Sequence, residues 1–375
     1  MNKVVVTGIG LVTALGFGRE KTWRAVLAGQ SGIKPDALNG GHLCARLADF
    51  EPPAATRLLS MAFLAAAEAM QDSRIDIAEI GAERVGCTVS VSKPNLASGV
   101  GEALRVSDIF MPETLGRQLS QIFKLRGPLR NVVAACASGT NSVIMGAEWI
   151  RHGICDAVIT GAVESSLHPL YQAAFRQMGV LAARHVRPFD KNREGFALGE
   201  GAGILVLERK DMAMLRGAPV YGEIAGSAMA NDAGHPVAFN LSGDVIARAI
   251  ATALTKAELD TVDYINAHGT GTKLNDVIET RAIKKALGSR AYDVSVSSTK
   301  AATGHLLGAS GAVECAFALL ALRDGVVPPT LNLYEPDGEC DLDYTPHCAR
   351  GKNMRTAMSL SFGFGGQIGV IVVSR

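Results

Sequence analysis

The sequence predicts an α/β protein whose sheets carry helices on both faces. Short runs rich in valine and isoleucine alternate along the chain with longer, alanine-rich segments of helical periodicity. The strand-like runs are apolar at nearly every position, which is typical of strands that are buried on both faces. The chain has 375 residues, 48% of them hydrophobic and 19% charged, so it is long enough and apolar enough for a large shared core.

The alternation of apolar runs and helical segments places the individual elements in chain order. The first strand is Val4-Val5-Val6-Thr7, which stops at Gly8 and has no cleavage site, so it is not a signal peptide. The predicted strands are residues 4–7, 85–91, 157–161, 202–208, 220–227, 264–266, 294–297, 357–362 and 368–373. The predicted helices are residues 19–28, 54–71, 138–151, 243–257, 277–287 and 308–323. A further short strand is expected at 132–135.

The two halves of the chain show a weak internal similarity. In the first half an apolar run leads to Cys136 and then to a helix of small residues; in the second, residues 294–297 lead through His305 to the small-residue helix 308–323. Two such βα layers packed back to back would bring their loops to one face. We therefore predict an N-terminal half, residues 1–217, that carries Cys136 and a C-terminal half, residues 218–375, that carries His268 and His305.

Cys136 lies where an apolar run ends and a helix of small residues begins. Backbone N–H groups and a helix N-terminus would face a thiol at such a turn, and both favour the thiolate over the thiol. This position is typical of a nucleophile. The alternative is a buried structural cysteine, the commoner fate of cysteine in an apolar stretch.

Two histidines follow strand ends in loops of glycine and small residues. His268 follows the apolar segment 262–265, and His305 follows strand 294–297. In α/β proteins the reacting groups are placed on such loops, and the neighbouring glycines permit close approach of a ligand. Either histidine alone could be a hydrogen-bonded bystander. Together with Cys136 they indicate an active site.

A carboxylate within the apolar helix 308–323 needs a partner. Glu314 would be costly to bury unpaired, and Lys300 and Asp276 are the candidate partners in neighbouring loops. The glycine-rich segment 195–203 is either part of the scaffold or a wall of the site.

Charge and cysteine content exclude several classes of protein. The formal net charge of +1 argues against a nucleic-acid-binding or membrane-surface protein, and no stretch is apolar enough to span a membrane. Seven cysteines without C-x-x-C spacing indicate neither a disulfide framework nor a zinc site. The cysteines suggest a reducing compartment, so we expect a cytoplasmic protein.

Taken together, the motifs resemble the elongating β-ketoacyl-acyl carrier protein synthases, the condensing enzymes of KAS I/II type in the thiolase superfamily. The resemblance covers essentially the whole chain and is most specific at the Cys136 turn, the His268 loop, the Lys300 to His305 loop and the tail 362–366. It implies a thiolase-like fold of two pseudo-duplicated βαβ halves in a five-layer αβαβα arrangement. It also implies an acyltransferase.

The resemblance assigns a role to each reacting group. Cys136 would accept the acyl group as a thioester. The backbone N–H groups of Cys136 and Phe364 would form the oxyanion hole, where one donor is worth roughly 3 kcal/mol, and Phe364 would gate the acyl pocket. His268 and His305, both neutral, would donate hydrogen bonds to the malonyl thioester carbonyl and stabilise the enolate formed by decarboxylation.

Supporting residues and partners follow from the same resemblance. Lys300, paired with Glu314 and Asp276, would orient the second histidine, and Thr270 and Thr272 would bind the pantetheine arm. No metal or organic cofactor is implied beyond the phosphopantetheine of an acyl carrier protein. The protein would form a homodimer or a heterodimer with a related subunit, and would bind neither nucleic acid nor membrane.

Several positions depart from the family pattern and leave the pathway open. Segment 92–124 is short and carries Arg117 and Gln118 where apolar residues usually line the acyl pocket and the dimer seam; Lys273 replaces a usual proline; and Arg57 alone represents the basic residues expected to dock the carrier. These changes are as compatible with polyketide or polyene synthesis as with fatty acid synthesis. Two alternatives are a condensing subunit active only beside a chain-length-factor-like partner, and a non-catalytic partner subunit.

Overall fold

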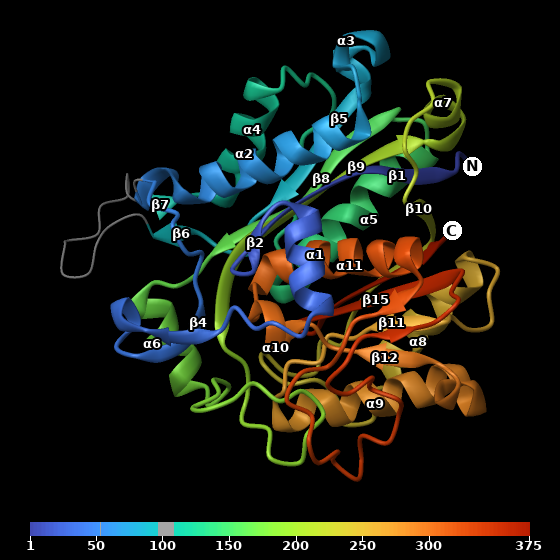
Figure 1. The fold of residues 1–375 in the computed structure, drawn as a ribbon. Coiled ribbons are helices and arrows are strands. Elements are labelled where there is room, and N and C mark those ends of the chain that lie inside the picture. The colour runs from blue at the N-terminus through green and yellow to red at the C-terminus, as the bar shows by residue number, and fades with distance from the viewer. Residues whose placement is uncertain (53, 97–108) are drawn as a thin grey trace.

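The computed structural model describes residues 1–52, 54–96 and 109–375, and it confirms the α/β prediction with five layers (Figure 1). Helices cover both outer faces, two sheets lie beneath them, and two helices lie between the sheets. The outer helices are α2 (Ala54–Ser73) and α4 (Pro112–Ile122) on one face and α8 (Asp244–Lys256) and α9 (Lys273–Leu287) on the other; the central pair is α5 (Ser138–Arg151) and α11 (Ser310–Asp324).

The first half of the chain forms a mixed sheet in the order β5–β8–β9–β1. Strands β5 and β8 are parallel, and β9 is antiparallel to both β8 and β1. These strands are β1 (Val4–Thr13), β5 (Val85–Ser90), β8 (Ala157–Ser165) and β9 (Leu198–Arg209).

The second half repeats this order and these directions in β11–β15–β16–β10 and adds β12 beside β11. Strand β10 is antiparallel to β16, β16 is antiparallel to β15, and β15, β11 and β12 are parallel. The strands are β10 (Gly222–Asn231), β11 (Tyr264–Asn266), β12 (Ser295–Ser297), β15 (Thr356–Gly363) and β16 (Gln367–Ser374). Pairing of Val5 with Glu223 joins β1 to β10, so the two sheet layers are connected at this edge into one hydrogen-bonded sheet. We propose that the halves divide at residues 217/218, between α7 (Lys210–Leu215) and β10.

The nine strands and six helices predicted in order along the chain are all present. The strand at 264–266 and the helix at 138–151 have the predicted ends, and the ends of the others are shifted. The remaining helices are α1 (Arg19–Leu27), α3 (Ile77–Ile80), α6 (Pro169–Gln177) and α10 (Lys300–Thr303). The remaining strands are β2 (Gly16–Phe17), β3 (Lys34–Asp36), β4 (His42–Ala45), β6 (Asn95–Leu96), β7 (Ile109–Phe110), β13 (Val326–Val327) and β14 (Arg350–Gly351).

The central helices α5 and α11 approach each other closely enough to require glycine. A Cβ added at Gly311 would lie 2.0 Å from Thr140 Oγ1, and one added at Gly139 would lie 2.8 Å from the carbonyl oxygen of Gly308. Both glycines lie in the first turn of their helix, just after Cys136 in one half and after His305 in the other. The small residues that mark these two helices therefore bring the two site loops together.

The additional strand expected at residues 132–135 is wrong. Only Leu129 pairs with β5, through Cys87, and residues 135–137 form a turn of 3-10 helix. Among the described residues no strand pairs with the outer side of this segment, and Val133 is 58% exposed. Because no described strand lies on that side, the backbone of this apolar run has no strand there with which to form hydrogen bonds.

The segment 92–124 lies partly outside the described residues, which omit 97–108. Arg117 is exposed on α4, and it is not among the residues that line the pocket described below. Gln118 is on the same helix, and its Oε1 is buried with no hydrogen-bond partner in the described part of the chain.

Candidate active site

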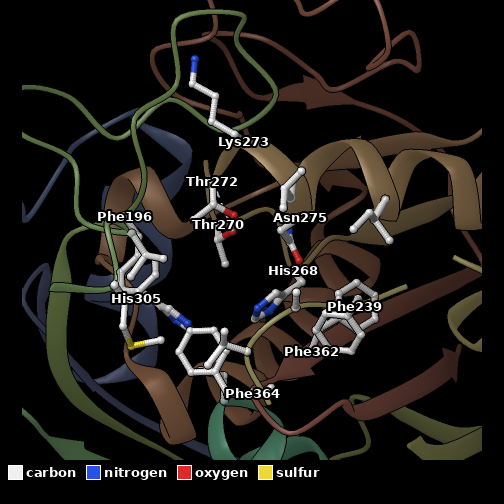
Figure 2. A pocket seen from close by; sticks show the side chains of 18 of the residues that line it. Phe196, Phe239, His268, Thr270, Thr272, Lys273, Asn275, His305, Phe362 and Phe364 are labelled. Atoms are coloured by element: carbon white, nitrogen blue, oxygen red, sulfur yellow. Dashed lines mark hydrogen bonds between the residues drawn. The ribbon is translucent and has the colours of Figure 1, made fainter. Parts of the chain in front are cut away.

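A pocket of about 280 Å³ brings the predicted reacting groups together (Figure 2). The rings of His268 and His305 lie on its opposite sides, with Phe364 beneath them in the view shown. The predicted site residues that line it are Cys136, His268, Thr270, Thr272, His305 and Phe364. They come from both halves of the chain, as the sequence predicts.

Cys136 lies in the 3-10 turn that leads into α5, and it is 7% exposed. The preceding Ala135 has a positive φ of 48°, an uncommon conformation for a residue with a Cβ. Gly363 packs against this turn so closely that a Cβ there would lie 3.0 Å from the backbone nitrogen of Cys136. The backbone next to Phe364 is thus held against Cys136, the predicted nucleophile.

Burial raises the pKa of the Cys136 thiol to about 12, although the charges of Lys93 and Lys300 act in the opposite direction. The expectation that the turn favours the thiolate is therefore wrong for the described chain. Desolvation of a buried sulfur outweighs the nearby positive charges. The resting side chain is a thiol.

The His268 loop is fixed by hydrogen bonds from its backbone. Ala267 N–H donates to the carbonyl oxygen of Ser297 at 2.9 Å, which ties the loop to β12. The buried carboxylate of Glu279 accepts from His268 N–H at 2.7 Å and from Gly269 N–H at 2.8 Å. We did not predict this role for Glu279. Its position three residues after Asp276, on the same helix face, is the sequence signal that indicates it.

The His305 loop is held against the start of β9. His305 N–H donates to the carbonyl of Ala197 at 2.8 Å, and Gly199 N–H donates to the carbonyl of His305 at 2.9 Å. The ring of Phe196 meets the His305 ring edge-on, with centroids 4.8 Å apart. The glycine-rich segment 195–203 is therefore both scaffold and wall of the site.

Both imidazoles are buried, and their ring centroids are 5.4 Å apart. Burial, reinforced by the charge of Lys300, lowers the pKa of His268 and of His305 well below the usual value. Both rings are neutral near pH 7, so each carries one N–H donor and one unprotonated nitrogen.

Lys300 and Glu314 form a buried ion pair, with side chains 0% and 3% exposed. Burial raises the pKa of the Glu314 carboxyl, and the charge of Lys300 opposes this. The expected pairing of Asp276 with Lys300 is wrong. Asp276 instead accepts from the backbone N–H groups of Phe189 at 2.7 Å and Gly271 at 3.1 Å, so it supports the loop that carries His268.

The mouth of the pocket contains Thr270, Thr272, Lys273 and Asn275 (Figure 2). The hydroxyl groups of Thr270 and Thr272 are 3.0 Å apart. Lys273 is exposed. Phe364 stacks on Phe175, with ring centroids 6.4 Å apart.

Arg57, expected to help dock the carrier, is committed elsewhere. It makes a two-point ion pair with the fully buried carboxylate of Glu200, and its side chain is 14% exposed. Among the described residues there is no cluster of three or more side chains that could hold a metal ion. No helix in the described part of the chain has the length and apolar character needed to cross a membrane.

Comparison with known proteins gives the family. A model of the β-ketoacyl synthase N-terminal domain matches residues 41–213, and a model of the C-terminal domain of the same family matches residues 221–334. The chain belongs to the β-ketoacyl synthase family. It is therefore an acyltransferase of the condensing type with the thiolase-like fold expected from its motifs.

Relatives from two kinds of pathway are equally similar to this β-ketoacyl synthase. The 3-oxoacyl-[acyl-carrier-protein] synthase 2 of Coxiella burnetii is 38% identical over 414 aligned positions, covering 100% of this chain and 98% of the relative. The tetracenomycin polyketide synthase ketoacyl synthase alpha subunit of Streptomyces glaucescens is 38% identical over 413 positions, covering 100% and 97%.

Solved structures of ketosynthases also superpose on the whole chain. A ketosynthase in complex with its type II polyketide synthase acyl-carrier protein superposes with a TM-score of 0.92 at 32% identity, covering 100% of this chain and 99% of that one. The ishigamide ketosynthase/chain length factor superposes with a TM-score of 0.90 at 32% identity and the same coverage.

Proposed function

We propose that the protein catalyses the decarboxylative condensation of an acyl thioester on Cys136 with a malonyl-acyl carrier protein. One observation carries the proposal: a buried thiol from the first half of the chain shares a single pocket with two neutral imidazoles from the second half. A hydrolase-like site would pair the thiol with one histidine base and a group that fixes that base. Two neutral N–H donors suit an oxygen that gains negative charge.

The proposed reaction has two stages, acyl transfer to Cys136 and then decarboxylation with condensation. Transfer of the acyl group from its carrier to Cys136 forms a thioester and releases the carrier thiol. The malonyl carboxylate then leaves as carbon dioxide, and the electron pair of the broken C–C bond moves onto the thioester carbonyl, whose oxygen is held by His268 and His305. The resulting enolate carbon attacks the acyl carbonyl, and the Cys136 sulfur leaves. The backbone N–H groups of Cys136 and Phe364 are suited to hold the oxygen of that tetrahedral intermediate.

The pocket mouth supports binding of a carrier protein's phosphopantetheine arm. Thr270 and Thr272 present hydroxyl groups to a chain entering the pocket, and Lys273 lies beside them with its cation exposed. No metal and no other organic cofactor is required by this scheme. Phe364 lines the pocket with the histidines and stacks on Phe175, so rotation of its ring would open the way to an acyl chain.

Two features bear on the partner subunit and the pathway. The outer side of segment 129–134 is not covered by any described strand, and Lys273 and segment 92–124 depart from the family's sequence pattern. We propose that the uncovered segment 129–134 is the contact with a second subunit, either a copy of this chain or a chain-length-factor-like partner. A polyketide or polyene pathway is favoured as much as fatty acid synthesis. All seven cysteines are unpaired, which supports a reducing, cytoplasmic location.

Intact-mass spectrometry tests the proposal. The purified chain is mixed with acyl carrier proteins loaded with short and long acyl chains, with Cys136→Ala as the matched control. An acyl adduct on the wild type alone is expected, and the preferred chain length identifies the pathway. Absence of an adduct with every carrier, both alone and with a chain-length-factor-like subunit added, would contradict the proposal.

A further inference from the structure

The two histidines differ in what contacts the Nδ1 nitrogen of the ring. His305 Nδ1 lies 2.9 Å from the hydroxyl oxygen of Ser310, the first residue of α11, and both residues are buried. His268 Nδ1 is also buried, but it has no hydrogen-bond partner among the described residues. Of the two histidines, His305 is therefore the one for which a side chain among the described residues can decide which nitrogen carries the proton.

We infer that Ser310 donates its hydroxyl proton to His305 Nδ1 and thereby holds the proton of the neutral ring on Nε2. The contact allows two arrangements, since either atom could be the donor. If Nδ1–H donated to the hydroxyl oxygen, the Ser310 proton would have no acceptor among the described residues, because its only hydrogen bond is to His305. A buried donor without an acceptor is unfavourable, so the arrangement in which Ser310 donates is favoured.

This arrangement makes Ser310 a positioning residue for the proposed reaction. With Nδ1 accepting from Ser310, Nε2 of His305 is an obligate donor, the state needed to hold the oxygen of an enolate. Among the described residues no side chain plays the same part at Nδ1 of His268. The catalytic consequence rests on the proposed condensation, whereas the position of the proton does not.

The inference is tested by ¹⁵N NMR of the full chain labelled at histidine, because the two neutral tautomers have distinct nitrogen shifts. The His305 signals are assigned by their loss in His305→Asn. We expect the Nε2–H tautomer alone in the wild type, a mixture of tautomers in Ser310→Ala, and the wild-type pattern in Ser310→Thr, which retains the hydroxyl. Ser359→Ala is the matched control, since Ser359 is a buried serine on β15 whose hydroxyl has no partner among the described residues.

A wild-type His305 protonated on Nδ1, or a Ser310→Ala spectrum identical to that of the wild type, would overturn the inference. If Ser310→Thr does not fold, comparison of the wild-type spectrum with that of Ser310→Ala still shows whether Ser310 determines the tautomer of His305. The kinetic readout is release of carbon dioxide from malonyl-acyl carrier protein: we expect kcat to fall about 10-fold in Ser310→Ala with KM unchanged. If the wild type releases no carbon dioxide, the proposed function fails while the NMR result still decides the tautomer.

Discussion

Removal of Lys300 alone should destabilise the protein far more than removal of Lys300 and Glu314 together. Both side chains are buried, so Lys300→Met leaves a carboxylate in the core without its partner. Breaking a buried ion pair in this way costs about 3–5 kcal/mol, whereas replacing both members with apolar side chains is close to neutral. For a chain of this length the entropy of unfolding is about 0.8 kcal/mol/K, so a loss of about 4 kcal/mol lowers Tm by about 5 °C.

The same substitution should change the pH dependence of activity. The Lys300 charge contributes to the lowered pKa of both His268 and His305. Without that charge their pKa values rise, so the rings become protonated at a higher pH on acidification. The acid limb of the rate profile for carbon dioxide release should therefore move to higher pH in both the single and the double variant.

Thermal unfolding and the pH–rate profile are measured for the wild type, Lys300→Met and Lys300→Met/Glu314→Leu. Equal Tm values for the single and double variants would refute the argument that the unpaired carboxylate is the cause of the loss. An acid limb that stays in place in both variants would refute the electrostatic link between Lys300 and the histidines.

Four further predictions concern the mouth of the pocket, the Cys136 thiol, the uncovered segment 129–134 and Arg57. Lys273→Glu should raise KM for the acyl carrier protein with kcat unchanged, most strongly at low salt, and a salt-independent effect would contradict a charge contact. Since the pKa of Cys136 is raised to about 12, about one thiol in 10⁴ is ionised at pH 8. The rate of alkylation by iodoacetamide should therefore rise about tenfold per pH unit from pH 7 to 10, and a plateau below pH 9 would contradict the raised pKa. Val133→Glu should shift the protein toward monomer in light scattering, while Leu215→Glu, at a position 91% exposed on α7, should not; equal effects of the two would place the contact elsewhere. Arg57→Ala should lower stability by about 3–5 kcal/mol and leave KM for the carrier unchanged, and a raised KM at unchanged Tm would restore a docking role.

The sequence by itself determined the order of elements and which three candidate reacting groups line one pocket. Valine and isoleucine runs and alanine-rich segments alternate so regularly that the strands and helices of both sheets could be placed. Cys136, His268 and His305 each follow an apolar run and precede small residues, a local pattern that needs no tertiary information. Both the elements and the positions of these three residues could be predicted because they depend on the periodicity and side-chain volume of residues that are neighbours in the sequence.

Only the tertiary structure decided how buried polar groups pair. From the sequence, Lys300 was expected to pair with both Glu314 and Asp276. The fold directs Asp276 to the backbone of Phe189 and Gly271 and leaves only Glu314 beside the lysine among the described residues. The pKa of Cys136 likewise depends on how completely the surrounding layers exclude water, which the turn sequence does not encode. Hydrogen-bond partners and desolvation are set by residues far apart in the chain, so they follow from packing and not from local pattern.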